Sequence, residues 1–281
     1  MYSNRFRSWA GIGKLVVTIA CLSSLVSATA TDTTLDQLLA RTSKHVSTFV
    51  DQFSEVKCTE HVTQEKLGDN EKVLRKAEST FDYLVILSNA SGELTLDESR
   101  LAVQDAKQSK KHEKKEKEKD QTTPLLVSNG FATLFLIFHP YYAGSFQFSA
   151  AGDEIINGKK FSKVHFQHIR NTRSVTALAV RGREYPLDLA GMAWIDPDTG
   201  AIAKITAGVE SGTMEDVGMK SLRSEVEFAP VRFGANGAPH WFPSTATVEV
   251  ETPRQHWRNL HRFSDYKQFS VSTEEQVAKQ Q

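Results

Sequence analysis

Apolar and polar residues alternate along parts of the second half of the chain. In residues 222–228 the small or apolar positions alternate with Arg223, Glu225 and Glu227, and residues 246–250 repeat the alternation. Successive side chains of a β-strand point to opposite faces of the sheet, so this period buries one face and leaves the other in water. The pattern predicts antiparallel strands with one solvated face.

The clearest turn of the chain lies in residues 193–201. Asp196 and Asp198 can accept hydrogen bonds from backbone amides two residues on, and Pro197 presets φ for the first corner of a turn. Gly200 can adopt the left-handed conformation that closes such a turn. These residues predict a tight β-hairpin.

Further β-prone segments are separated by turn residues. The β pattern begins at Glu55 and reaches a turn at Gly68-Asp69-Asn70. About ten strands in a meander are more than a flat open sheet of this size comfortably carries. We therefore predict an α+β fold that is mainly antiparallel β, with a curved sheet or unclosed β-barrel. The remaining predicted strands are residues 72–79, 81–87, 145–149, 160–169, 175–180 and 262–271.

Two segments are predicted to be helical and to cover the concave face of this sheet. Residues 34–53 place their apolar residues on one helical face, with Thr33 or Thr34 positioned to cap the first turn. Residues 124–138 are strongly apolar and longer than a typical strand. We expect a buried or barrel-capping helix there, with a strand as the alternative.

The beginning of the chain has the features of a secretory signal peptide. Residues 1–30 contain Arg5, Arg7 and Lys14, no acidic residue, a short apolar run and a small-residue end. The apolar run is shorter than the ~20 residues of a transmembrane helix. We expect cleavage near Ala30 and a periplasmic or secreted protein.

The two cysteines raise separate questions. Cys21 follows Thr18-Ile19-Ala20, which loosely resembles a bacterial lipobox, so a lipid anchor at Cys21 is the alternative to cleavage near Ala30. After that cleavage Cys58 is the only cysteine, and no internal disulfide can form. We expect Cys58 to be a small buried hydrophobe.

The length of the chain after residue 30 is consistent with one β-rich domain, residues 31–281, and its charge bears on the kind of partner. Removing residues 1–30 takes away three of the 34 basic residues and none of the 34 acidic ones, which leaves a net charge of −3. A nearly neutral chain argues against nucleic acid as the main partner. Residues 107–120 alternate lysines with acidic residues, and we expect a solvated, flexible insert there rather than a contact with anionic lipid.

Several short segments resemble a known superfamily. They are the hairpin 194–205, residues 222–228 running into Ala229-Pro230, the stretch Trp241-Phe242-Pro243 before a strand, and Tyr266-Lys267-Gln268-Phe269. In this order, after a signal peptide and a helix, they are similar to the outer-membrane lipoprotein-sorting (LolA/LolB-like) superfamily, with this chain as a diverged relative. The resemblance implies an unclosed β-barrel whose helix-covered concave side takes the acyl chains of a lipidated protein or another apolar molecule.

Two groups of residues are candidates for ligand contact. Small apolar residues of one parity around the hairpin leave room on the concave face for an apolar ligand, or equally for a packing helix. A basic-aromatic cluster near the end of the chain can contact phosphate or lipid headgroups, although a solvated outer strand face explains it too. The apolar face comprises Ala193, Ile195, Ala201, Ala203, Ile205 and Ala207, and the headgroup candidates are Arg254, Trp257, Arg258 and Arg262.

The motif search gives no support to catalysis. Residues 31–281 contain no H-E-x-x-H, no C-x-x-C, no G-x-S-x-G and no phosphate-binding loop, so we predict no catalytic residue, no metal and no cofactor. The leading hypothesis is an exported, non-enzymatic binding protein that holds a lipid, a lipidated chain or another apolar ligand between sheet and helices. The alternative is a structural or adaptor protein of the cell envelope that acts through protein–protein contacts.

Overall fold

The fold is described from a computed structural model. It covers residues 34–53, 55–88, 94–103, 130, 132–180, 183–209, 214, 218–233 and 237–269. The chain divides into two units, Met1–Asp32 and Thr33–Gln281, and all of the described residues belong to the second. The predicted signal peptide with Cys21 and the lysine-rich insert lie outside the described residues.

A long amphipathic helix opens the described part, as predicted. Helix α1 spans Leu35–Phe53, and its core-facing side chains include Leu38, Val46 and Phe53. The Oγ1 atom of Thr34 accepts a hydrogen bond from the backbone N–H of Gln37 at 3.3 Å, which satisfies one of the donors left open in the first turn. Thr34 is therefore the residue that caps the helix.

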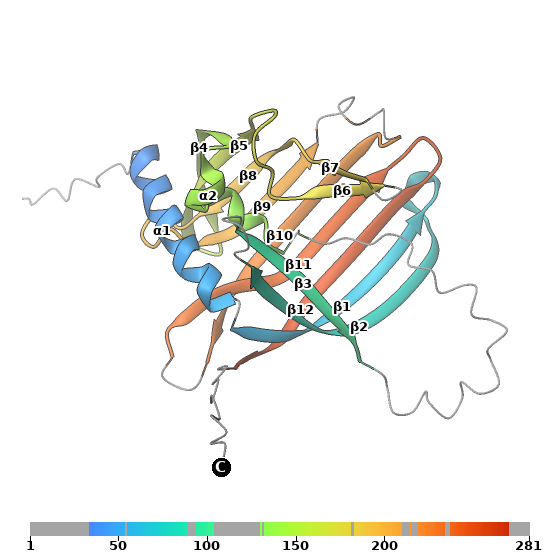
Figure 1. Cartoon of the computed structure of the whole chain (residues 1–281), viewed down its shortest axis with the longest axis horizontal. Coiled ribbons are helices and arrows are strands. Elements are labelled where there is room, and N and C mark those ends of the chain that lie inside the picture. Colours follow the sequence, from blue (N-terminus) through green and yellow to red (C-terminus); the bar gives the residue numbers. More distant parts are fainter. Residues whose placement is uncertain are drawn as a thin grey trace, which may run out of the picture. The chain divides into compact units, whose positions relative to one another are not determined.

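Ten strands form one open antiparallel sheet, which confirms the predicted fold class. Their order is β3-β2-β1-β12-β11-β10-β9-β8-β5-β4 (Figure 1), so the first three strands follow the last one in space. Strands β3 and β4 lie at opposite edges and leave the sheet unclosed. The strands are β1 (Val56–Leu67), β2 (Val73–Ser88), β3 (Thr95–Ala102), β4 (Phe146–Ile156), β5 (Lys159–His168), β8 (Leu189–Ile195), β9 (Ile202–Val209), β10 (Ser221–Arg232), β11 (Pro239–Glu251) and β12 (His256–Gln268).

Several predicted boundaries are wrong. The segments 72–79 and 81–87 are parts of the single strand β2, and a short 3-10 turn, η1 (Asp69–Glu71), precedes it. Ala177–Val180 forms β6, which pairs with β7 (Arg183–Pro186) in a separate two-stranded sheet. The last strand begins at His256 rather than Arg262, because the basic and aromatic residues of this region also alternate between two faces.

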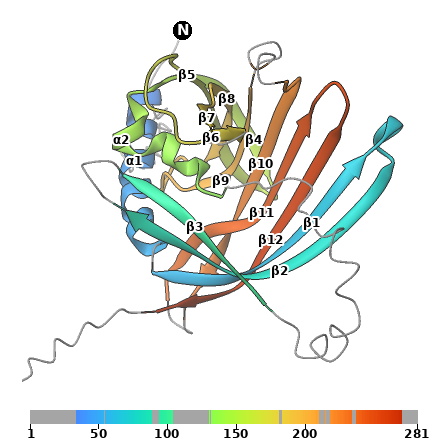
Figure 2. The same ribbon diagram turned by 45° about the vertical axis from the view of Figure 1, so that its right-hand side comes forward.

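Helical segments cover the inner face of the sheet beside β8 and β9 (Figures 1 and 2). In the predicted helix 124–138, the described part contains the 3-10 helix η4 (Leu134–Phe138), and all five of its residues are buried. It leads into the short helix α2 (Pro140–Ala143). The described part of this apolar segment is thus buried as predicted, but Leu134–Phe138 forms a short 3-10 helix rather than part of a long α-helix.

Aromatic rings join these helical segments to the sheet. The ring of Phe49 in α1 lies 4.9 Å from that of Phe135 in η4 and 5.2 Å from that of Phe242 in β11. Phe53 lies 5.7 Å from Phe242. Edge-to-face and tilted pairs at such distances are favourable beyond their buried area. This cluster fixes the helices against the inner face.

A glycine allows the close packing of strands β8 and β9. A Cβ atom on Gly191 would lie 1.9 Å from the backbone oxygen of Thr206 and 2.8 Å from the Phe166 ring. Any other residue would therefore collide with the neighbouring strand. The fully buried Phe166 ring occupies the space beside Gly191 instead.

Candidate functional site

The structure gathers five of the six predicted apolar-face residues in the core. Ala193, Ile195, Ala201, Ile205 and Ala207 are all 5% exposed or less. They pack in the same buried cluster as α1 and η4, apart from Ala201, which lies at the turn. In the described part of the chain, this face is filled by the protein's own side chains.

Ala203 leaves this face because the register changes beside it. Trp194 pairs with Lys204, whereas Ile195 pairs with Ile202, so Ala203 is the extra residue of a bulge. Ile202 takes the buried place and is 3% exposed. The sequence prediction assumes that residues after the turn alternate strictly between the two faces, and a bulge breaks that alternation.

The predicted hairpin also fastens α1 to the sheet. The Asp196 carboxylate accepts a hydrogen bond from the Asp198 backbone N–H at 3.0 Å, as the turn residues predict. It also forms an ion pair with Lys159, whose Nζ lies 2.7 Å from Oδ2. Arg41 of α1 donates a hydrogen bond to the backbone oxygen of Pro197. Gly200 has φ of +76°, and a Cβ there would lie 2.8 Å from the Arg41 backbone. The turn therefore requires glycine both for its conformation and for its contact with the helix.

A buried ionic network lies on the inner side of the other half of the sheet. Arg100 of β3 donates two hydrogen bonds to Glu60 of β1, at 2.5 and 2.9 Å, and its Nη1 lies 3.0 Å from the carboxylate of Glu98. His261 of β12 contacts Glu60 through Nδ1 at 2.8 Å. The guanidinium also lies 5.2 Å from the ring centre of Tyr83 in β2. Four adjacent strands are thereby joined through one set of side chains.

The two glutamates of this network differ in proton affinity. Burial alone would raise the pKa of Glu60, but the hydrogen bonds from His261 and Arg100 lower it below its ordinary value. Burial raises the pKa of Glu98 despite the opposing charge of Arg100, and the charge of Glu60 adds to the increase. The network therefore holds its negative charge on Glu60 and binds a proton more readily at Glu98.

This network is absent from the sequence predictions, although one signal points to it. Glu60 shares its parity with the buried residues Val56, Cys58 and Val62, so a charged residue stands in a row of core positions. Its partner Arg100 is 40 residues away and His261 is 201 residues away. Local pattern can therefore flag Glu60 but cannot name its partners.

Cys58 lies two positions from Glu60 and is 4% exposed. Burial raises the pKa of its thiol to about 12. The predicted small buried hydrophobe is confirmed.

Of the four predicted headgroup residues, Arg258 and Arg262 share the outer face of β12, whereas Trp257 is on the other face. Arg258 lies on the outer face and forms ion pairs with Glu65 at 2.8 Å and Glu249 at 3.7 Å. Arg254 and Arg262 are exposed, whereas Trp257 shares its parity with the buried residues of β12. The charge of Arg258 is already balanced by carboxylates, and a headgroup role for these residues stays a prediction.

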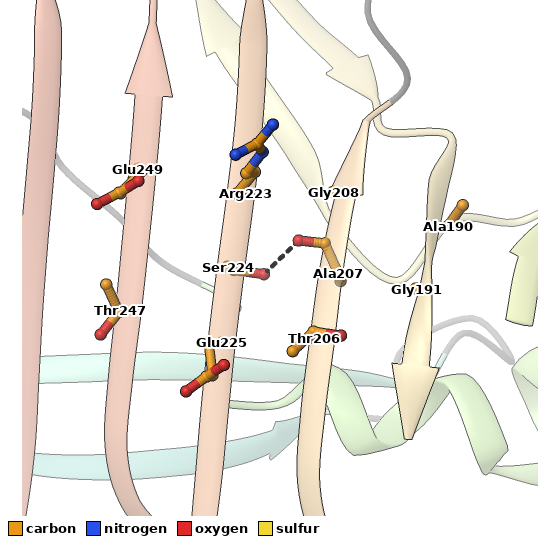
Figure 3. A pocket seen from close by; sticks show the side chains of 10 residues that line it. All are labelled: Ala190, Gly191, Thr206, Ala207, Gly208, Arg223, Ser224, Glu225, Thr247 and Glu249. Carbon is orange, nitrogen blue, oxygen red and sulfur yellow. Dashed lines mark hydrogen bonds between the residues drawn. The ribbon is translucent and has the colours of Figure 1, made fainter. Parts of the chain in front are cut away.

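A hollow of about 500 Å³ lies on the outer face of β8–β11. Figure 3 shows Arg223, Glu225, Thr247 and Glu249 along one side of it and the small residues of β8 and β9 along the other. The floor is low because Ala190 and Gly208 pair with each other and have little or no side chain. A second hollow of about 470 Å³ includes Ala203 among its lining residues.

The described residues contain neither a metal-binding cluster nor a membrane-spanning helix. No group of three or more histidine, cysteine, aspartate or glutamate side chains there is placed to hold a metal ion. No helix of the described part is long and apolar enough to cross a membrane.

Comparison with known proteins gives likenesses of fold only. No family model matches the sequence, and no curated protein matches it. A DUF1329 family protein from Desulfovibrio piger is similar with a TM-score of 0.42 and 10% identity, over 85% of this chain and 94% of the other. A LolA superfamily protein from Nitrosomonas europaea has a TM-score of 0.36 and 9% identity, over 84% and 94%.

A domain assigned to outer membrane lipoprotein-sorting proteins, from Vibrio parahaemolyticus, has a TM-score of 0.40 and 9% identity, over 84% of this chain and 95% of the other. Two of these three solved proteins are named for the LolA superfamily or for lipoprotein sorting. Because all three scores are below 0.5, we draw no argument about ligand or partner from them.

Proposed function

We propose that this chain is an exported, non-enzymatic binding protein that holds a lipid, a lipidated chain or another apolar ligand between its curved sheet and the helical segments. The ligand would lie on the small-residue face of β8 and β9, where Ala193 and Ala207 leave space beneath η4. Entry requires the helical segments to move, because their aromatic side chains occupy that space in the structure.

One observation carries this proposal: the helical cover is held over small residues mainly by apolar side chains. The five residues of η4 are buried, and the rings of Phe49, Phe53 and Phe135 lie against one another and against Phe242. An acyl chain can replace such contacts without leaving a polar group unsatisfied. Movement of the cover also breaks the hydrogen bonds from Arg41 to Pro197 and from Tyr142 to Leu94, so the binding free energy must offset these two bonds as well as the repacking of apolar side chains.

Native mass spectrometry of protein extracted gently from its own envelope tests this proposal. We expect bound lipid, and binding of a fluorescent fatty acid that is weakened by Ala193→Leu, which fills the inner face. Thr206→Leu is the matched control because Thr206 lies on the outer face of the neighbouring strand. Ligand-free protein in repeated preparations, together with no fatty-acid binding, would contradict the proposal.

A second candidate is an adaptor that acts through protein contacts in the envelope. It is favoured by the filled inner face and by the hollow of about 500 Å³ on the outer face. Crosslinking in intact cells separates the two candidates. A reproducible protein adduct favours the adaptor, and lipid adducts favour the binding protein.

A further inference from the structure

An exposed apolar patch lies on the outer face of the free sheet edge formed by β2 and β3. Ile86 is 49% exposed, Leu101 is 62% exposed and Val103 is 48% exposed. Leu84 is half-buried between them, opposite Ser99 of β3. Solvent-exposed side chains of this size at a sheet edge favour association with another polypeptide.

The edge strand has one paired side within the described part of the chain. β3 forms its ladder with β2, and no other strand of the ten-stranded sheet adjoins it. Its alternate backbone N–H and C=O groups therefore face outward from the sheet. This arrangement is a template for the addition of an extended segment.

The buried network keeps this edge strand in place. Glu98 and Arg100 point inward from β3, and Arg100 reaches Glu60 on β1, across β2. The strand is thus anchored by side chains as well as by its ladder. A segment that adds to a strand already held in its bound conformation loses less free energy to ordering.

The charges beside the patch identify the kind of partner. Asp97 lies opposite Ile86, and Asp82 lies opposite Leu101, and both carboxylates are exposed on the same outer face. The basic residue opposite Leu84 is Lys57 on β1, two strands from the edge. One exposed carboxylate, Asp97, lies on β3 itself, and a second, Asp82, lies one strand further in on β2. Within the described residues the outer face of this edge is therefore acidic and complements a basic segment.

We propose that β3 binds an extended, basic segment of a partner protein by strand addition. In antiparallel register the segment places an apolar residue beside Leu101 and, four positions later, a lysine or arginine beside Asp97. Pairing of two copies of this chain through β3 is disfavoured, because it gathers the aspartates of both copies at one interface. The proposal is independent of the proposed apolar ligand, which would lie on the opposite face of the sheet.

Two fluorescent eight-residue peptides test the proposal on the full chain by anisotropy. Each has threonine at alternate positions and two valines in the first half, and the second half carries two lysines in one peptide and two glutamates in the other. We expect the lysine peptide to bind at least about tenfold more tightly, which corresponds to about 1.4 kcal/mol. Asp97→Lys should reverse this preference.

Leu101→Lys should abolish binding of the lysine peptide, whereas Ile155→Lys should leave it unchanged. Ile155 is the matched control because it is 74% exposed on β4, at the opposite edge. Thermal unfolding of each variant separates loss of binding from loss of fold. Equal binding of both peptides to the native chain would overturn the proposal. So would an equal loss of lysine-peptide binding in Leu101→Lys and Ile155→Lys. Dimerisation that Leu101→Lys abolishes, without peptide binding, would also overturn it in favour of contact between copies.

Discussion

The inner faces of the two halves of the sheet are buried by different kinds of side-chain interaction. Beside β8 and β9 the face is lined with small apolar residues and covered by helical segments with aromatic rings. Beside β12, β1, β2 and β3 it carries an ionic network centred on Glu60 and Arg100. Apolar packing is non-directional and tolerates exchange of one apolar group for another, whereas a buried ion pair requires each partner in a fixed place. The first half is therefore suited to rearrangement and the second to fixing strand register.

Loss of an aromatic ring in the first half should have the largest effect on stability. Phe135→Ala removes a side chain that is 1% exposed and contacts Phe49 and Phe53. We expect a loss of about 4 kcal/mol in the free energy of unfolding, measured by urea denaturation. The loss should be nearly the same at pH 4 and pH 7, because the contacts carry no charge. A strong pH dependence of this loss would show that the two halves are not energetically distinct.

Loss of the central carboxylate in the second half should cost slightly less and should depend on pH. Glu60→Gln leaves Arg100 and His261 without their shared acceptor charge, and we expect a loss of about 3 kcal/mol at pH 7. The lowered pKa of Glu60 means that its stabilisation is present above its ordinary pKa of 4.5 and is lost as pH falls through the lower folded value. The difference between native protein and variant should therefore shrink in acid.

The matched variant Glu98→Gln should behave in the opposite direction. Because the pKa of Glu98 is raised, its stabilisation is present at low pH and is lost as pH rises through the raised value. The variant should gain stability relative to the native protein as pH increases above 4.5. Parallel pH profiles for the two glutamine variants would contradict the assignment of the charge to Glu60.

The hairpin that joins α1 to the first half gives an intermediate effect. Gly200→Ala introduces a Cβ at positive φ and against the backbone of Arg41, and we expect a loss of about 2 kcal/mol. Hydrogen exchange should increase in α1 more than in β1. An increase confined to the hairpin itself would show that α1 is held elsewhere.

The smallest effect is expected on the outer face. Arg258→Met removes a guanidinium whose side chain is 24% exposed and that pairs with Glu65, which is 11% exposed, and with Glu249, which is 34% exposed. Partial screening should limit the loss to about 1 kcal/mol. Arg100→Met, which removes the inner guanidinium, should cost several times more. If Arg258→Met and Arg100→Met lose equal free energy of unfolding in urea, the inner and outer ion pairs do not differ in stability.

Local pattern was sufficient for features whose causes are local. The capped helix 34–53, the hairpin 193–201 and the alternation in residues 222–228 each follow from side chains within a few positions of one another. The single strand β2 was divided in the prediction because polar residues occupy both faces of its first half, which is exposed.

The ionic network could not be assembled from the sequence because its partners meet only in the folded sheet. Glu60 is recognisable as a charge at a core position, but the neighbours of β1 depend on the placement of the last strand beside the first. The same limit applies to Ala203, whose position depends on a bulge in the pairing of β8 and β9. The unpredicted network and the shifted position of Ala203 both depend on register and strand order rather than on residue preference.

The pairing of the first strand with the last also has a kinetic consequence. Val56 of β1 pairs with Gln268 of β12, so the sheet joins residues from the two ends of the described chain. Contacts of such high sequence separation slow folding, because a long loop must close before they form. During synthesis β1, β2 and β3 emerge with one flank unpaired and with Glu60 still lacking His261. We therefore expect slow folding completed by its last strand, during which the growing chain depends on protection from aggregation.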